Sequence, residues 1–252
     1  MLSEKRVRIF LATVLIFSGI GITVNAEELI PTYYCKKAEK KIKIDGIIDK
    51  EWEKAEAVNF VEVESATVPQ WGTEARMLWD KEYLYISFLC LDPDIWAVYK
   101  EKDSSLWEEE VVEVFIDPDG DGKNYIELEI NPYNTNIDLF WPMIPPKCGF
   151  TWRRAALYDL KGLKSKVYLK GTINNFEDKD EYWSVEIAIP WENFSIAKAK
   201  NLPPKDKDEW RINLYRYERP IETQRYELTA WSPTYKRNFH IPERFGKVIF
   251  LE

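Results

Sequence analysis

The chain has 252 residues, of which 35 are Lys or Arg and 43 are Asp or Glu, so its net charge at pH 7 is −8. No run of Lys or Arg interrupts this acidic composition, and we therefore expect no nucleic-acid partner. The length suits one domain with a sizeable core, and three cysteines are too few for a disulfide framework.

The N-terminal segment has the pattern of a signal peptide. Three basic residues precede an apolar run over residues 9–24, and Val24-Asn25-Ala26 resembles a signal peptidase site. The run contains Ser, Thr and Gly and is short for a membrane span, although an uncleaved anchor is the alternative. We predict that residues 1–26 are removed and that residues 27–252 form one secreted or periplasmic domain without a membrane attachment.

Short strand-like runs follow one another along the rest of the chain. Turn residues separate them, and prolines stand at their ends, where a missing N–H does least harm. The runs cover residues 58–64, 74–80, 83–91, 111–117, 124–130, 136–141, 165–173, 182–189, 210–218, 226–231 and 246–251, with short helical turns expected within 49–57 and 191–194. Their regular spacing predicts an all-β fold: a single antiparallel β-sandwich, jelly-roll or immunoglobulin-like, with few short helical turns.

Alternation within three of these runs separates an apolar face from a polar one. Val112, Val114 and Leu128 point one way, because successive side chains of a strand alternate between the two faces. The opposite face carries carboxylates, an amide and tyrosines: Glu113, Tyr125, Glu127, Glu129, Asn213 and Tyr215. Such a face is equipped to form hydrogen bonds with the hydroxyl groups of a sugar.

Aromatic residues are abundant. The chain has 11 Trp and 14 Tyr, and many of them stand beside charges, Gly or Pro. Exposed rings in an exported protein favour ligands with flat apolar faces, such as sugars, although we expect most of these aromatic residues to lie in the core.

The loop DPDGDG predicts a cation site. It spaces Asp117, Asp119 and Asp121 two residues apart before a glycine, as in the opening of a calcium loop. The twelfth position is Leu128, so the bidentate glutamate of an EF-hand is missing, and an acidic hairpin turn is the alternative. Other oxygen clusters are conceivable at Asp45 with Asp49, and at Asp92 with Asp94. We expect a structural calcium ion at the loop.

An ordered set of motifs resembles carbohydrate-binding module family 9 and its stand-alone relatives. The set is D-G-x-x-D-x-x-W from Asp45, L-W-D-x-x-Y-L-Y from Leu78, V-E-V-F-I-D from Val112, W-S-P from Trp231 and a late F-G at Phe245. The resemblance extends from about Ile42 to the C-terminus. It implies an antiparallel β-sandwich that binds a polysaccharide or oligosaccharide without catalysis.

The resemblance also implies a set of sugar-binding residues. Trp107 and Trp231 correspond to the two tryptophans that hold a terminal sugar between them in that family. Glu113 and Asn213 correspond to polar side chains that bind its hydroxyls, and Tyr125 lies on the same predicted face. Glu129 stands where the well-described modules have an arginine, so an anionic acceptor replaces a cationic donor and the choice of sugar is expected to differ.

Two other functions stay open from the sequence. Glu113 paired with Glu127 or Glu129 is a candidate acid/base pair for a glycoside-active enzyme. A haem-binding electron-transfer domain is the other possibility, with His240 beside Met77 or Met143 as axial ligands.

The three cysteines support two expectations. Cys90 lies on the apolar side of its strand and is predicted to be a buried thiol. Cys35 and Cys148 both adjoin irregular sequence, and we expect them to pair.

Overall fold

Short strands form the framework of the fold. The computed structural model describes residues 29–143, 150–220 and 226–252, so the predicted signal peptide and Cys148 lie outside the described residues. The strands are β1 (Thr32–Lys37), β2 (Val58–Asn59), β3 (Val61–Glu62), β4 (Thr73–Trp79), β5 (Tyr83–Leu91), β6 (Val111–Asp117), β7 (Tyr125–Ile130), β8 (Asn136–Trp141), β9 (Lys164–Lys170), β10 (Tyr182–Pro190), β11 (Glu209–Glu218), β12 (Glu227–Ala230) and β13 (Gly246–Leu251).

Within the described residues, helical structure is limited to short turns. They are α1 (Trp152–Ala155) and the 3₁₀ turns η2 (Trp52–Lys54), η3 (Leu106–Glu108), η5 (Trp191–Ser195) and η6 (Pro242–Arg244). The predicted all-β sandwich is thus confirmed, and η2 and η5 fall within the two stretches where helical turns were expected.

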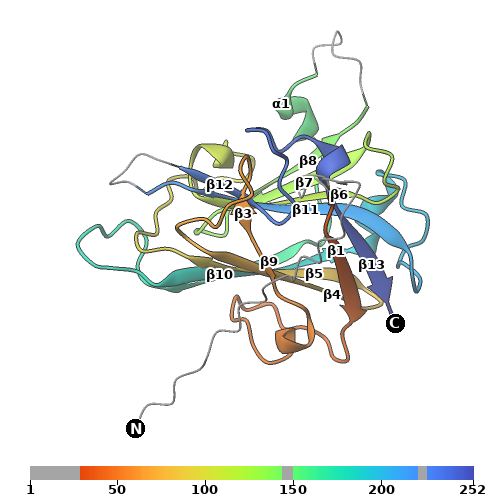
Figure 1. Cartoon of the computed structure of the whole chain (residues 1–252), viewed down its shortest axis with the longest axis horizontal. Coiled ribbons are helices and arrows are strands. Elements are labelled where there is room, and N and C mark those ends of the chain that lie inside the picture. Colours follow the sequence, from red (N-terminus) through yellow and green to blue (C-terminus); the bar gives the residue numbers. More distant parts are fainter. Residues whose placement is uncertain (1–28, 144–149, 221–225) are drawn as a thin grey trace, which may run out of the picture.

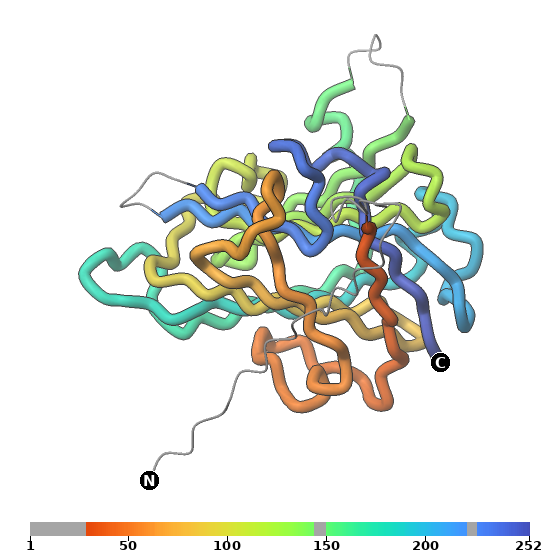
Figure 2. The backbone as a smooth tube through the Cα atoms, in the orientation of Figure 1, coloured from red at the N-terminus to blue at the C-terminus, as the bar shows by residue number. Residues whose placement is uncertain are grey.

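The strands form two layers (Figures 1 and 2). We call β12, β11, β6, β7 and β8 the β6 sheet, and β4, β5, β10 and β9 the β5 sheet. Hydrogen bonding is continuous in the order β8-β7-β6-β11-β13-β1-β4-β5-β10-β9, so β13 and β1 lead from one layer into the other. The sandwich is therefore closed along one side by paired strands.

Strand β1 is the exception to the antiparallel pattern. It pairs in parallel with β13, from Thr32 opposite Lys247 to Lys36 opposite Leu251, and in parallel with β4 at Lys36 and Lys37. No strand was predicted over these residues. Its partners lie far along the chain, and parallel pairs cannot be joined by the short hairpins that a sequence pattern reveals.

The main core lies between the two sheets. It contains the apolar residues predicted for the inner face, Val112, Val114 and Leu128, opposite Ile86 and Phe88 of β5. Six of the eleven tryptophans are buried: Trp52, Trp79, Trp183, Trp191, Trp210 and Trp231. Core packing therefore accounts for about half of the tryptophan excess, and the remaining five are partly exposed.

A separate layer covers the outer face of the β5 sheet and explains the first family-like motif. The Glu186 carboxylate of β10 accepts hydrogen bonds from the backbone N–H groups of Asp45 (2.7 Å) and Gly46 (2.8 Å) and from Trp52 Nε1 (2.7 Å). The Asp45 and Asp49 carboxylates accept N–H groups two residues ahead, as turn residues do. This motif holds the N-terminal segment onto the sheet.

The late F-G motif also has a structural cause. Gly246 begins β13, and a Cβ atom there would lie 2.4 Å from Cζ3 of the Trp231 ring. We expect Gly246→Ala to destabilise the protein by roughly 1–3 kcal/mol, because an added methyl group would overpack this part of the core. Urea unfolding measures the change. Gly72→Ala is the matched control, since its Cβ would meet Leu91 Cδ1 at 3.6 Å, an ordinary contact; equal stability of the two variants would contradict the prediction.

Candidate functional site

Three glutamates gather on the outer face of the β6 sheet. Alternation places Glu113 of β6 and Glu127 and Glu129 of β7 on the side away from the main core. Glu113 lies directly opposite Glu129 in the antiparallel register, and Glu127 is opposite Phe115, one step along the same face. The carboxylates therefore lie close together across two neighbouring strands.

These glutamates are buried, although they face away from the main core. Their exposed fractions are 2% for Glu113, 4% for Glu127 and 1% for Glu129. Desolvation raises the pKa of all three, and the neighbouring carboxylates raise those of Glu113 and Glu129 further. One oxygen of Glu129, Oε2, has no hydrogen-bond partner among the described residues. The face thus contains acceptors whose hydrogen-bonding capacity is not used up.

Aromatic rings surround the three glutamates. Trp107 of η3 and Trp152 of α1 meet edge to face with ring centroids 5.0 Å apart, and Tyr217 of β11 packs in the same cluster. The Trp107 backbone lies next to Glu129 and acts against the rise in the pKa of that carboxyl group. Trp141 of β8 donates its Nε1–H to Glu127. All four rings are partly exposed, so apolar ring surface lies next to the buried acceptors.

A cation and a histidine complete this face. An Nη2–H of Arg219 donates to the Trp107 carbonyl, and its guanidinium lies over Tyr217, 5.2 Å from the ring centroid. Its positive charge acts against the rise in the Glu113 pKa. At the other end, His240 Nδ1 lies 4.0 Å from Glu127 and 2.9 Å from the Tyr125 hydroxyl. The face therefore offers both donors and acceptors.

Several of the residues predicted for the site meet here. Trp107, Glu113 and Glu129 lie together. Tyr125 shares their face but is 8% exposed, stacks against Phe115 and bonds to His240, which lies next to Glu127. These four predicted residues therefore lie on the same side of the β6 sheet.

Trp231 lies elsewhere. It is 7% exposed, belongs to the main core with Tyr33 and packs over Gly246. Its backbone N–H bonds to the carbonyl of Leu214, a residue of the inner face. Trp107 packs in a different cluster on the outer side of the same sheet. The expected pair of facing walls is therefore corrected: the two rings are separated by the sheet.

Asn213 is fully buried and already bonded. Its Oδ1 accepts the N–H groups of Leu214 and Ser232, each at 3.0 Å, and its Nδ2 donates to the Ser232 carbonyl at 2.8 Å. The side chain holds the segment after β12 in place, and the structure does not present it to a ligand.

The site includes residues that the sequence interpretation missed. Trp141, Trp152 and Tyr217 were not selected, and neither was Arg219. Trp141 and Tyr217 continue the outer-face alternation of β8 and β11, so the period of two could have identified them. Trp152 precedes two arginines in an irregular stretch, and no local pattern indicates its position.

The acidic loop joins β6 to β7. Oxygens of Asp117, Asp119 and Asp121 lie within 4.8 Å of one another, with Asp117 buried and the other two exposed. The Asp117 carboxylate accepts N–H groups of Gly120 (3.1 Å) and Gly122 (2.8 Å). Desolvation raises its pKa to about 6. This donor set fits a hard cation, and the same bonds equally support a hairpin turn.

The cysteines and the residues of the haem alternative are distributed as follows. Cys90 is a buried free thiol, as predicted, and so is Cys35 of β1, whose expected partner lies outside the described residues. His240 bonds to Tyr125, Met77 is fully buried between the sheets, and Met143 is 66% exposed. Met77 and His240 thus lie on opposite sides of the β6 sheet, and the two side chains do not face each other.

A hollow occurs on the opposite sheet. It has a volume of about 340 Å³ and lies on the outer face of the β5 sheet, where Ile47, Arg76, Tyr168 and Tyr182 are among its lining residues. It is one competing location for a ligand on the described surface, and a larger hollow of about 560 Å³ lies beside Tyr83, Trp191 and Leu202.

The raised pKa of Glu129 predicts an unusual pH dependence of stability. A carboxyl group whose pKa is higher in the folded protein contributes stability below its unfolded-state pKa of about 4.3 and loses it as pH rises toward the folded value. We expect Glu129→Gln to raise stability at pH 8 by roughly 1–3 kcal/mol and to flatten its decline with pH. Urea unfolding from pH 4 to pH 9 measures both, with exposed Glu177→Gln as control. A destabilised variant at pH 8 would show that the ionised Glu129 is held by favourable contacts.

Known proteins share parts of this sequence and this fold. Residues 44–142 match the sequence model of the carbohydrate family 9 binding domain-like family. The chain is 24% identical over 210 residues to endo-1,4-beta-xylanase A of Thermotoga maritima, a match that covers 83% of the chain and 17% of the xylanase. It is 25% identical over 202 residues to a protein of Arthroderma benhamiae named "Extracellular protein", covering 77% of the chain and 85% of that protein. The chain spans only 17% of the length of the xylanases that it matches.

Solved structures have the same architecture. A family 9 module of Caldicellulosiruptor kristjanssonii in complex with cellotriose superposes with a TM-score of 0.59 at 18% identity, covering 87% of this chain and 93% of that one. A putative carbohydrate-binding protein of Bacteroides uniformis gives a TM-score of 0.66 at 17% identity, covering 88% and 100%. Residues 44–142 thus resemble the carbohydrate family 9 binding domain-like family, and the chain shares the fold of these solved structures.

Proposed function

We propose that this protein is an exported, non-catalytic carbohydrate-binding protein that holds a polysaccharide or oligosaccharide on the outer face of the β6 sheet. The observation that carries the proposal is the meeting of partly exposed rings with buried carboxylates. Trp107, whose ring meets that of Trp152, lies beside Glu129, and Glu129 lies opposite Glu113 on the same face. Related family 9 modules have been solved in complex with cellotriose and with glucose.

Each part of this face has a role in sugar binding. The apolar C–H face of a sugar ring stacks on Trp107 or Trp152, since aromatic faces favour such contacts. Glu113 and the unpartnered Glu129 Oε2 accept hydrogen bonds from hydroxyls, and Arg219 donates to them. Because two of the direct contacts are carboxylates, the site favours sugars that present several hydroxyl donors on one side.

We favour a role of these glutamates in sugar binding over a role in hydrolysis. Their burial and the pairing of Glu113 with Glu129 resemble a conceivable acid/base pair, but the family to which the chain is similar is one of binding modules. The xylanase relatives are matched over 17% of their length. Incubation of the purified protein with a polysaccharide panel and measurement of released reducing ends tests this part, and any release that Glu113→Gln abolishes would overturn it.

Export rests on residues 1–26. None of the helices in the described part of the chain is long and apolar enough to cross a membrane. N-terminal sequencing of the protein recovered from the medium or periplasm tests the proposed cleavage after Ala26.

Removal of the Trp107 ring should weaken sugar binding without lowering the stability of the fold. We expect Trp107→Ala to weaken binding of the best ligand from a glycan array at least tenfold, a change of about 1.4 kcal/mol, because stacking contributes on that scale. Thermal unfolding should change little, since Trp107 is partly exposed. Calorimetry and melting curves measure the two effects.

Tyr168→Ala provides the matched comparison for this test. Tyr168 is 39% exposed and lines the hollow on the β5 sheet, so its removal deletes an exposed ring at this competing location. We expect unchanged affinity. Full affinity in Trp107→Ala with loss in Tyr168→Ala would move the sugar site to the other sheet.

We further propose that Asp117, Asp119 and Asp121 bind one structural calcium ion. Replacing the two exposed carboxylates in Asp119→Asn/Asp121→Asn should then remove one bound ion per chain in elemental analysis. It should also reduce the rise in melting temperature that calcium produces, because a ligand stabilises the state that binds it. Asp178→Asn in another exposed acidic loop is the control. An unchanged ion content and melting response would leave the loop as an acidic hairpin turn.

A further inference from the structure

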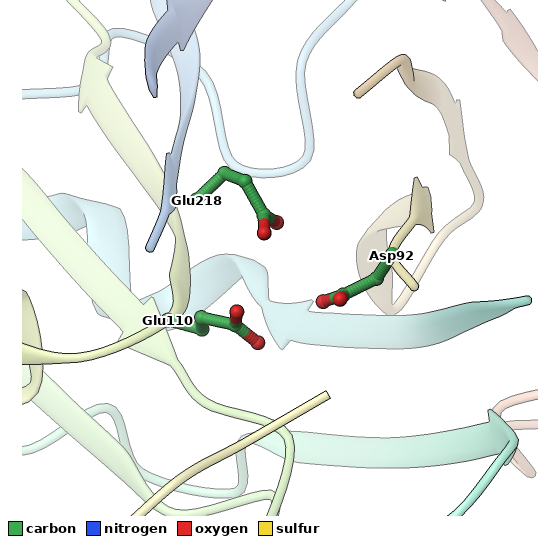
Figure 3. A group of neighbouring side chains, drawn as sticks. All are labelled: Asp92, Glu110 and Glu218. Carbon is green, nitrogen blue, oxygen red and sulfur yellow. The ribbon is translucent and has the colours of Figure 1, made fainter. Parts of the chain in front are cut away.

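A second group of carboxylates lies inside the sandwich, where the inner-face alternation of three strands ends in charged residues. Glu110 precedes the apolar inner positions of β6, Glu218 ends those of β11, and Asp92 follows those of β5. The three side chains come from different parts of the chain and point toward one another between the sheets (Figure 3).

This cluster is closed to solvent. Asp92, Glu110 and Glu218 are 0–1% exposed, and one oxygen of each lies within 4.8 Å of the others. Hydrophobic residues of the main core, among them Val112 and Cys90, adjoin it along the strands. Bulk water therefore cannot screen the mutual repulsion of the carboxylates.

Arg216 supplies the one positive charge that bonds to this group in the described structure. Its Nη2 contacts Asp92 Oδ2 at 3.2 Å and also Glu218 Oε2, while its Nη1 donates to the Leu91 carbonyl at 2.9 Å. Three ionised carboxylates and one guanidinium leave two negative charges uncompensated. Charges buried in this way are retained only when they are paired or bind a metal.

Two carboxylate oxygens of the cluster have no hydrogen-bond donor. Glu110 Oε1 and Glu218 Oε1 lack a partner among the described residues, although both side chains are almost completely buried. The other oxygen of Glu110 accepts the Trp96 N–H at 3.3 Å, and the Glu110 carboxyl group also lies next to that of Asp92. The free oxygens are hard, anionic ligands of the kind that divalent cations of the calcium class prefer.

We propose that Asp92, Glu110 and Glu218 bind a divalent cation, with calcium as the first candidate. An ion of charge +2 balances the three carboxylates and Arg216 to zero and gives both unpartnered oxygens a ligand role. The site is separate from the loop between β6 and β7, which lies at the opposite end of β6. It is also independent of sugar binding.

The test uses a background in which the loop carboxylates are removed, Asp119→Asn/Asp121→Asn. We expect this background to retain one divalent ion per chain after dialysis against calcium, measured by elemental analysis. Titration with terbium should give luminescence sensitised by tryptophan, since Trp96 bonds to Glu110 and Trp183 lies 6.0 Å from the Arg216 guanidinium. Adding Glu110→Gln should weaken terbium and calcium binding at least tenfold, whereas exposed Glu108→Gln should not.

A folded background that holds no ion, shows no sensitised luminescence and melts equally in calcium and in chelator would overturn the proposal. Two protons would then balance the cluster instead. If Glu110→Gln does not fold, Glu218→Gln serves as the second variant. The ion content of the background is in any case measured without either substitution.

Discussion

The two-residue alternation of the strands is the constraint on which the rest of this structure depends. Residues of β6 and β11 that point inward form the core between the sheets, and those that point outward form the glutamate and aromatic surface. A shift of one residue in the β6–β11 register would exchange the two sets. Register at Leu214 opposite Val114 therefore fixes both the stability of the sandwich and the chemistry of its outer face.

The protein buries acidic side chains on both sides of one sheet, and the two groups differ in their neighbours. Glu113 and Glu129 lie on the outer face, in the neighbourhood of rings that are partly exposed. Glu110 and Glu218 lie between the sheets, next to Arg216 and the main core. Position in the sandwich, rather than residue type, separates the two groups.

Much of the fold could be predicted from local pattern, and the site only in part. The β5 run Tyr83–Leu91 and the β6 run Val111–Asp117 were predicted with the bounds that the structure has, because alternation and bordering turns are local signals. β1 was missed because its pairing depends on strands far along the chain. Trp231 was misplaced because the space that its ring fills is opened by Gly246, fifteen positions away, which no local reading of W-S-P reveals.

The same distinction applies to the family-like motifs. D-G-x-x-D-x-x-W and the late F-G are sequence signatures whose residues here serve packing: three donors converge on Glu186, and one glycine accommodates an indole. A motif can thus identify a fold correctly while its individual residues have no contact with a ligand. Assignment of roles required the face on which each residue lies.

The parallel pairing of β1 with β13 gives the molecule a mechanical property. Five residue pairs join these strands, from Thr32 opposite Lys247 to Lys36 opposite Leu251. A force that pulls the N-terminal end of β1 away from the C-terminal end of β13 acts along both strands in opposite directions. It shears all the hydrogen bonds of the pair together, whereas the same force on a hairpin would open them one after another. The strand that closes the sandwich is therefore also the one that would resist tension applied along the chain.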